Sequence, residues 1–200
     1  MAEGSAARRL APEQRKRLLV GAAEETFASR GYTQAGLAEV AELAGVSKTL
    51  LYHYFPDGRP ELYREVMQRL VGEVVDAVRA ATRAPTSTSD RVADLVAALV
   101  TWFDEHHDAY RLLVLEPWGS GDPGVVGQAM AVRARLAGEL TALLASAGQP
   151  LPVTQAGGAA ALGAVLQVCE LAMAGQLDRD EAIALGQSFV AAGLGALDLG

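Results

Sequence analysis

Four side chains between residues 48 and 53 place a positive charge and several hydrogen-bonding groups in one short segment. Lys48 carries an ammonium group, Thr49 and Tyr52 carry hydroxyls, and His53 carries an imidazole. Groups of these types bind phosphate oxygens and the edges of nucleic-acid bases. On a helix, where successive residues are 100° apart, the four side chains occupy one arc of roughly 140°. The segment therefore predicts a polar helix face suited to a charged, hydrogen-bonding partner.

The residues around this face predict how the helix is held. The preceding tetrapeptide, 44–47, is typical of a tight turn, because Gly45 can adopt a positive φ and Ser47 can cap the next helix. A helix with one polar and one apolar face is what a helix-turn-helix requires, since the apolar side packs on the preceding helices while the polar side enters a major groove. The alternative is a surface helix whose polar face is only solvated. The apolar arc contains Val46, Leu50, Leu51, Tyr54 and Phe55.

The rest of the chain predicts further helices, because turn and capping residues divide it and no sustained alternation predicts strands. A linker is expected over 84–89 and a loop over 116–121. Asp122 before Pro123, and Asp178 with Glu181, have the spacing of helix starts. The sequence thus predicts an all-α fold with helices at about 12–31, 36–43, 48–54, 60–82, 89–106, 108–115, 123–146, 153–175 and 178–197.

Residues 13–73 resemble the tetracycline-repressor (TetR) family of bacterial regulators. The resemblance implies an N-terminal three-helix domain over 13–73, with the helix-turn-helix at about 36–55, and a helical ligand-binding and dimerisation domain over 74–200. It also implies that a bound small molecule releases the protein from DNA. The residues that carry it are Ala22-Ala23-Glu24-Glu25-Thr26-Phe27 with Gly31-Tyr32, Leu37-Ala38-Glu39-Val40-Ala41, Ala44-Gly45-Val46-Ser47, Leu51-Tyr52-His53-Tyr54-Phe55 and Glu61-Leu62.

The expected DNA-binding residues include two positions where the chain departs from the family pattern. Gly36 stands where a serine or threonine is common, so only its backbone N–H is left for a phosphate. The link of residues 56–60 is one residue longer than usual, with Arg59 in place of the usual lysine. The complete expected set is Gly36, Ser47, Lys48, Thr49, Tyr52, His53, Tyr54 and Arg59.

The last two expected helices, at about 153–197, are rich in Gly and Ala and more apolar than half-exposed helices need to be. Small residues allow close helix packing, and this pattern fits a two-fold interface in which two helices from each chain form a four-helix bundle. Ordinary core packing is the alternative. We expect a homodimer, because two recognition helices one turn of DNA apart read a palindrome.

A ligand pocket is expected among the middle helices, where aromatic and soft side chains occur with a few polar ones. For each of these side chains taken alone, ordinary core packing is the favoured alternative. The scarcity of basic residues favours a mostly apolar ligand, neutral or cationic. Asp104, His107 and Asp108 could share a helix face, which raises a metal site as an alternative. The adjacent His106 and His107 point about 100° apart, a poor spacing for metal ligands, and we expect neither a metal nor a cofactor. The candidate pocket residues are Trp102, Phe103, His106, Tyr110, Trp118, Met130, Cys169 and Met173.

Charge and composition bound the class of protein. The net charge is −7, yet the first 59 residues hold eight basic and seven acidic residues, so the negative charge lies in the rest of the chain. The N-terminus is polar and basic, with no apolar segment after it, and a single cysteine is present. These features predict a cytoplasmic protein with no membrane partner. Arg8, Arg9, Arg15, Lys16 and Arg17 form either an arm along DNA or a solvated tail and first turn.

The resulting prediction is a ligand-responsive repressor that binds a palindromic double-stranded DNA operator as a dimer and is released by a small, apolar effector of unknown identity. An all-helical interaction or sensor protein without operator binding is the first alternative. An enzyme is the second, although the chain lacks a GxxxxGK[ST] loop, an HExxH pair and a CxxC, and Ser120 has no GxSxG context.

Overall fold

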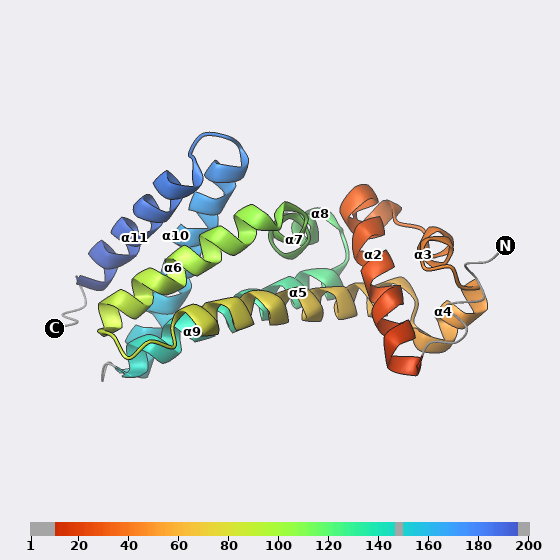
Figure 1. Ribbon diagram of the computed structural model, residues 1–200, viewed down its shortest axis with the longest axis horizontal. Coiled ribbons are helices and arrows are strands. Elements are labelled where there is room, and N and C mark those ends of the chain that lie inside the picture. Colours follow the sequence, from red (N-terminus) through yellow and green to blue (C-terminus); the bar gives the residue numbers. More distant parts are fainter. Residues whose placement is uncertain (1–10, 147–149, 196–200) are drawn as a thin grey trace. The chain divides into compact units, whose positions relative to one another are not determined.

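The computed structural model describes residues 11–146 and 150–195, and every regular element in these ranges is a helix. Figure 1 shows their order along the chain. They are α2 (Pro12–Gln34), α3 (Leu37–Leu43), α4 (Lys48–Tyr54), α5 (Arg59–Ala81), α6 (Thr88–Glu105), α7 (His107–Tyr110), the π-helix η1 (Arg111–Leu115), α8 (Glu116–Gly119), α9 (Pro123–Ser146), α10 (Leu151–Met173) and α11 (Arg179–Gly195). The predicted all-α fold is confirmed.

Helix ends follow the capping residues in the sequence. The Asp122 carboxylate accepts from the N–H of Gly124 at 2.8 Å, and Pro123 begins α9. Asp178 and Glu181 form a reciprocal capping box before α11, with both bonds at 2.9 Å. Gly31, where the first helix was expected to end, has a φ of 75° and interrupts α2, although helical turns resume to Gln34. The predicted last residues of α11, 196 and 197, lie outside the described ranges.

The region 107–121 differs from the sequence-based expectation. One helix was predicted over 108–115, but α7 passes directly into the π-helix η1, whose Leu112, Leu113 and Val114 are buried. The loop predicted from Glu116 is also wrong over its first four residues, which form α8 with a proline in its first turn. Proline is tolerated there because the first N–H groups of a helix have no partner within it.

The chain folds into two compact units. One contains the residues up to Leu70 together with Asp108–Ala129, and the other contains Val71–His107 together with the residues from Met130 onwards. The expected division into 13–73 and 74–200 placed 108–129 with the C-terminal part of the chain. In the structure this segment packs instead with the N-terminal helices.

An aromatic cluster explains why 108–129 joins the first unit. Phe27 and Tyr32 of α2 pack against Tyr63 of α5, with ring centroids 5.1 and 4.9 Å away. The buried Tyr63 hydroxyl donates to the backbone oxygen of Leu112 at 2.9 Å, and the Tyr32 hydroxyl donates to the Asp122 carboxylate at 2.8 Å. Residues far apart in the sequence thus share one core.

Alkaline pH is expected to loosen this core. Burial, with the hydrogen bond to Asp122, raises the pKa of Tyr32 from 10.0 to about 12. A raised pKa means that the contribution to stability is complete below pH 10 and is lost as the pH rises towards 12. Tyr32→Phe should cost about 1 kcal/mol at neutral pH and reduce the loss of stability above pH 10. Urea unfolding at pH 7 and pH 11 measures both, and a variant as alkali-sensitive as the natural protein would contradict this assignment.

In the second unit, α6, α10 and α11 lie side by side (Figure 1), and the buried residues Leu99, Val165 and Ala182 come one from each helix. The guanidinium of Arg179 at the start of α11 binds the Asp104 carboxylate of α6 at 2.6 Å. Among the described residues α10 alone has the length and apolar composition of a membrane-spanning helix. That resemblance carries little weight, because core helices of compact proteins share the composition.

Gly158 of α10 packs tightly against α9. A Cβ atom there would lie 2.5 Å from the Thr141 hydroxyl and 2.9 Å from the backbone oxygen of Ala137. Gly158→Ala should therefore destabilise the protein by about 1–3 kcal/mol through overpacking. Gly163 on the same helix has no neighbour within 4 Å of such a Cβ.

Gly163→Ala is the matched control and should stabilise by about 0.5–1 kcal/mol, because alanine loses less backbone entropy than glycine in a helix. Thermal unfolding followed by circular dichroism, at one protein concentration, measures both changes. Equal effects of the two substitutions would show that the contact between α9 and α10 is not tight.

Candidate nucleic-acid interface

The helix-turn-helix consists of α3, the four residues 44–47 and α4. Gly45 adopts a φ of 63° in the turn, and the N–H of Val46 donates back to the Ala41 carbonyl at 2.9 Å. The Ser47 hydroxyl accepts from the N–H of Leu50 at 3.2 Å and so caps α4. The turn and the cap predicted from the sequence are thus confirmed.

The two faces of α4 separate as the sequence predicted. Lys48, Thr49, Tyr52 and His53 are all exposed. The Lys48 ammonium lies 6.0 Å from the centroid of the Tyr52 ring, whose side chain is 42% exposed. This contact keeps the positive charge and the phenol on the same outer face. On the opposite face, Leu51 and Phe55 are fully buried and hold α4 against the other helices of the unit.

Tyr54 lies away from the exposed face. It is half-buried, and its hydroxyl accepts a hydrogen bond from the Arg15 guanidinium of α2 at 3.0 Å. Its ring also meets that of His53 edge-on at 5.6 Å. Tyr54 therefore fixes the position of α4 relative to α2, and its expected contact with DNA stays a prediction.

Gly36 is the N-cap residue of α3, with an extended backbone (φ −92°) and no side-chain cap. A Cβ atom there would meet no neighbour within 4 Å, so a larger residue fits without strain. The start of α3 therefore offers only backbone N–H groups to an anion.

Arg59 is directed towards the end of α2. Its guanidinium donates to the backbone oxygen of Thr33 at 2.9 Å and lies 5.8 Å from the Tyr32 ring centroid. The side chain is only partly exposed. A phosphate bound by Arg59, as predicted, would compete with Thr33 and Tyr32 for the guanidinium. The link before it is ordered by Gly58, which has a φ of 70° and whose carbonyl accepts from Leu62.

The basic residues near the start of the chain have several surroundings. Arg8 and Arg9 lie outside the described residues. Arg15 holds Tyr54, as described above, and the Lys16 ammonium pairs with the Glu65 carboxylate at 2.9 Å. Arg17 is exposed on α2. Two of the three described residues of this cluster thus have structural contacts.

The expected ligand residues are divided between the two units. Tyr110 and Trp118 belong to the first unit, and the other six belong to the second. Trp118 and Met130 are exposed, at 52% and 60%. Phe103 and Cys169 are core residues, and burial raises the pKa of the Cys169 thiol to about 12. His106 is exposed and stacks on the buried Trp102 ring at 4.4 Å, while Met173 is half-buried.

Of the two carboxylates considered for a metal, Asp104 is engaged in ion pairs and Asp108 is exposed. Asp104 binds Arg179 and also lies 3.9 Å from the His107 imidazole. Among the described residues no group of three or more His, Cys, Asp or Glu side chains is arranged to hold a metal ion.

These features define a class: an all-helical protein whose N-terminal unit presents a helix-turn-helix with a polar, basic exposed face. Residues 19–66 match the family model described as bacterial regulatory proteins, tetR family. The chain is 46% identical over 67 residues to the HTH-type transcriptional activator FasR of Mycolicibacterium smegmatis. This aligned segment covers 34% of this chain and 30% of that protein. The chain is 43% identical over 63 residues to the regulator LuxR of Vibrio harveyi, covering 32% and 30%. The matched segment thus spans about a third of these relatives.

Solved structures extend the likeness in fold to almost the whole chain. A TetR-like transcriptional regulator from Rhodococcus sp. RHA1 superimposes with a TM-score of 0.74 at 23% identity, over 94% of this chain and 99% of that one. The fatty acid degradation regulator FadR of Bacillus halodurans gives 0.74 at 20% identity, over 87% and 96%. The N-terminal segment thus matches the tetR family of bacterial regulatory proteins, and the chain shares the fold of these solved structures.

Proposed function

We propose that this protein is a ligand-responsive transcriptional repressor that binds a palindromic DNA operator as a homodimer in the cytoplasm. The observation that carries the proposal is the separation of faces on α4, where a basic, hydrogen-bonding surface is exposed and the apolar side is buried. The regulatory family, which is not a family of enzymes, supports the same function. The alternative of a helical protein without DNA binding leaves this exposed set of side chains unexplained.

In the proposed complex α4 enters the major groove. Lys48 binds a phosphate or a guanine edge, and Thr49 contacts a base edge or a thymine methyl group. Tyr52 and His53 donate to phosphate oxygens and set the position of the helix. Because α4 is only seven residues long, its depth in the groove depends on α2, through the bond between Arg15 and Tyr54.

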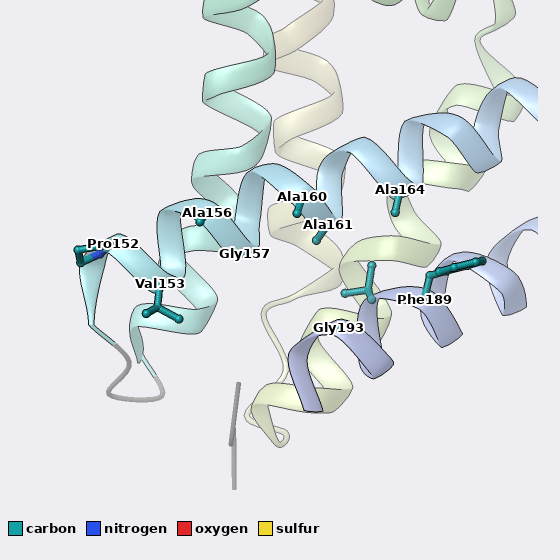
Figure 2. Close-up of a pocket in the computed structure, with 10 residues that line it drawn as sticks. Pro152, Val153, Ala156, Gly157, Ala160, Ala161, Ala164, Phe189 and Gly193 are labelled. Atoms are coloured by element: carbon teal, nitrogen blue, oxygen red, sulfur yellow. The ribbon is translucent and has the colours of Figure 1, made fainter. Parts of the chain in front are cut away.

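The proposed dimer forms through α10 and α11. A groove of about 590 Å³ lies along these helices, and its lining residues carry no charge. Figure 2 shows small side chains of α10, among them Ala156, Ala160 and Ala164, along one side and Phe189 of α11 on the other. Phe189 is 60% exposed. We propose that a second copy of the chain, rather than lipid, covers this apolar surface and completes a four-helix bundle.

The proposed effector is a small molecule with a mostly apolar body, which biases the dimer towards a conformation that no longer fits consecutive major grooves. The relative FasR is named an activator. An operator that overlaps a promoter would support repression by this chain, and an operator upstream of the promoter would favour activation instead.

The test is selection of bound duplexes from a random pool, followed by titration of the selected duplex at several salt concentrations. A repressor of this kind should select a palindrome, with an affinity that falls steeply as salt rises. Selection of no sequence, with weak binding to all duplexes, would contradict the proposal and favour an interaction protein.

Gly36→Ser should strengthen operator binding a few-fold without changing the selected sequence. The added hydroxyl caps α3, which stabilises the protein by a few tenths of a kcal/mol, and it offers a phosphate a further hydrogen bond. Gly36→Ala, which fits the same space, is the matched control and should not gain affinity. Equal affinities of the serine and alanine variants would show that α3 does not begin at a phosphate.

A further inference from the structure

A second groove lies in the second unit, between α6 and the end of α5. Its volume is about 500 Å³, within the ~300–1,000 Å³ range of small-molecule sites. Its floor is made of small apolar side chains, namely Ala77 and Ala81 of α5 and Ala97 and Ala98 of α6. The remaining lining residues all come from α6, so one helix sets the character of the groove.

Two carboxylates and an indole give the groove its chemistry. Asp94, Trp102 and Glu105 line it together with Thr101, and none of its lining residues within the described ranges is basic. Asp94 and Glu105 are eleven residues apart on one helix, which places them about 16 Å apart along its axis. The groove is therefore an apolar channel with negative charge near each end.

The two carboxylates are not equivalent. The Arg179 guanidinium lies 3.6 Å from Glu105, so a positive charge already faces that end. Asp94 is half-buried beside the alanines, and the basic residue one turn before it, Arg91, donates its Nε to the Thr82 carbonyl at 3.2 Å. No basic side chain among the described lining residues therefore balances the negative charge of Asp94.

Trp102 closes the other end with apolar surface. It is 8% exposed, and His106 stacks on its ring at 4.4 Å with 12° between the planes. The stacked imidazole holds the indole in place. Eight residues separate Asp94 from Trp102, which corresponds to about 12 Å along the helix.

We propose that this groove binds an organic ammonium ion with an aliphatic tail. The ammonium group pairs with Asp94, the tail crosses the alanine floor, and its end contacts Trp102. An anion would be repelled by both carboxylates, and a neutral molecule would leave Asp94 without a counter-charge as it loses water. The assignment of this cation as the effector rests on the proposed function. Binding of the cation to the groove is measured without DNA.

The experiment uses the full chain with Trp118→Phe, which leaves Trp102 as the only indole. Its fluorescence is followed during titration with n-octyltrimethylammonium, kept below the concentration at which micelles form. Saturable binding of one cation per chain is expected. The matched compounds n-octanol and n-octyl sulfate should bind at least about tenfold more weakly, because they lack the charge that pairs with Asp94. Equal binding of the neutral or anionic compound would overturn the proposal.

Three charge-neutralising variants locate the cation. Asp94→Asn should weaken binding about tenfold. Glu105→Gln should change it by less than about twofold, because an arginine already faces that carboxylate. Asp180→Asn, exposed on α11, removes the same charge outside the groove and should have no effect. Circular dichroism confirms that each variant is folded. Unchanged binding by Asp94→Asn, or an equal loss with Glu105→Gln, would overturn the assignment.

Operator titration with and without the cation separates this proposal from the proposed function. If the chain binds its operator but no cation, the ammonium site alone is wrong. If the cation binds at Asp94 while no DNA sequence is selected, the site stands and the repressor function is wrong.

Discussion

Lys48→Ala should weaken operator binding by about tenfold at physiological salt and reduce the slope of log affinity against log salt by about two for a dimer. The reason is that Lys48 is exposed at the start of α4, and each lost phosphate contact removes about one released counterion per chain. Titration of the selected duplex at several salt concentrations gives both numbers. Arg83→Ala, exposed beyond the end of α5, is the matched control and should change neither.

Two further variants of α4 separate positioning from sequence recognition. Tyr52→Phe should weaken binding to all duplexes alike, since a phosphate contact carries no sequence information. Thr49→Ala should lower discrimination at one base pair by about 1–3 kcal/mol and leave the salt slope unchanged. If Lys48→Ala and Tyr52→Phe both leave the affinity intact, α4 does not lie in the major groove.

Ala160→Glu should convert the dimer to monomers and lower operator affinity by at least about a hundredfold. The residue is exposed and lines the apolar groove of α10 and α11, so a carboxylate there would be buried without a partner in the dimer. Loss of the dimer removes one of two recognition helices, and the half-site that remains binds far more weakly. Sedimentation and operator titration measure the two effects.

The matched control is Ala159→Glu on the same helix. Ala159 is also exposed but lies outside the groove, in a stripe with Gln155 and Glu170. This variant should stay dimeric and bind the operator normally. Dissociation of both variants, or of neither, would show that the dimer does not form through the groove.

The sequence predicted features that depend on neighbouring residues. Ser47 caps α4, and Asp178 with Glu181 begins α11, because side chains at these spacings reach the free N–H groups of a helix. The exposed face of α4 was predicted for the same reason, since helical geometry alone decides which side chains share a side. The segment 108–129 was not, because the contact between Tyr63 and Leu112 depends on residues far apart in the chain and leaves no periodic signal.

The expected ligand residues show a different limit. They were chosen by side-chain type, which does not say where a residue points, and Trp118 and Met130 face outwards. The groove of α6 was missed because alanines carry no chemical signature. Its signal was the spacing of Asp94, Ala98, Thr101 and Glu105, which places one acidic and apolar stripe along a helix.

The aromatic core that joins α2, α5 and the 108–129 segment has a consequence for dissecting this protein. The chain passes between its two units three times, after Leu70, His107 and Ala129, and each crossing falls inside a helix. A fragment that ends at residue 73 would leave the Tyr63 and Tyr32 hydroxyls without their acceptors, the Leu112 carbonyl and the Asp122 carboxylate. The N-terminal helices therefore do not form a domain that can be cut out at residue 73, and transferring them to another protein would require all three junctions to be rebuilt.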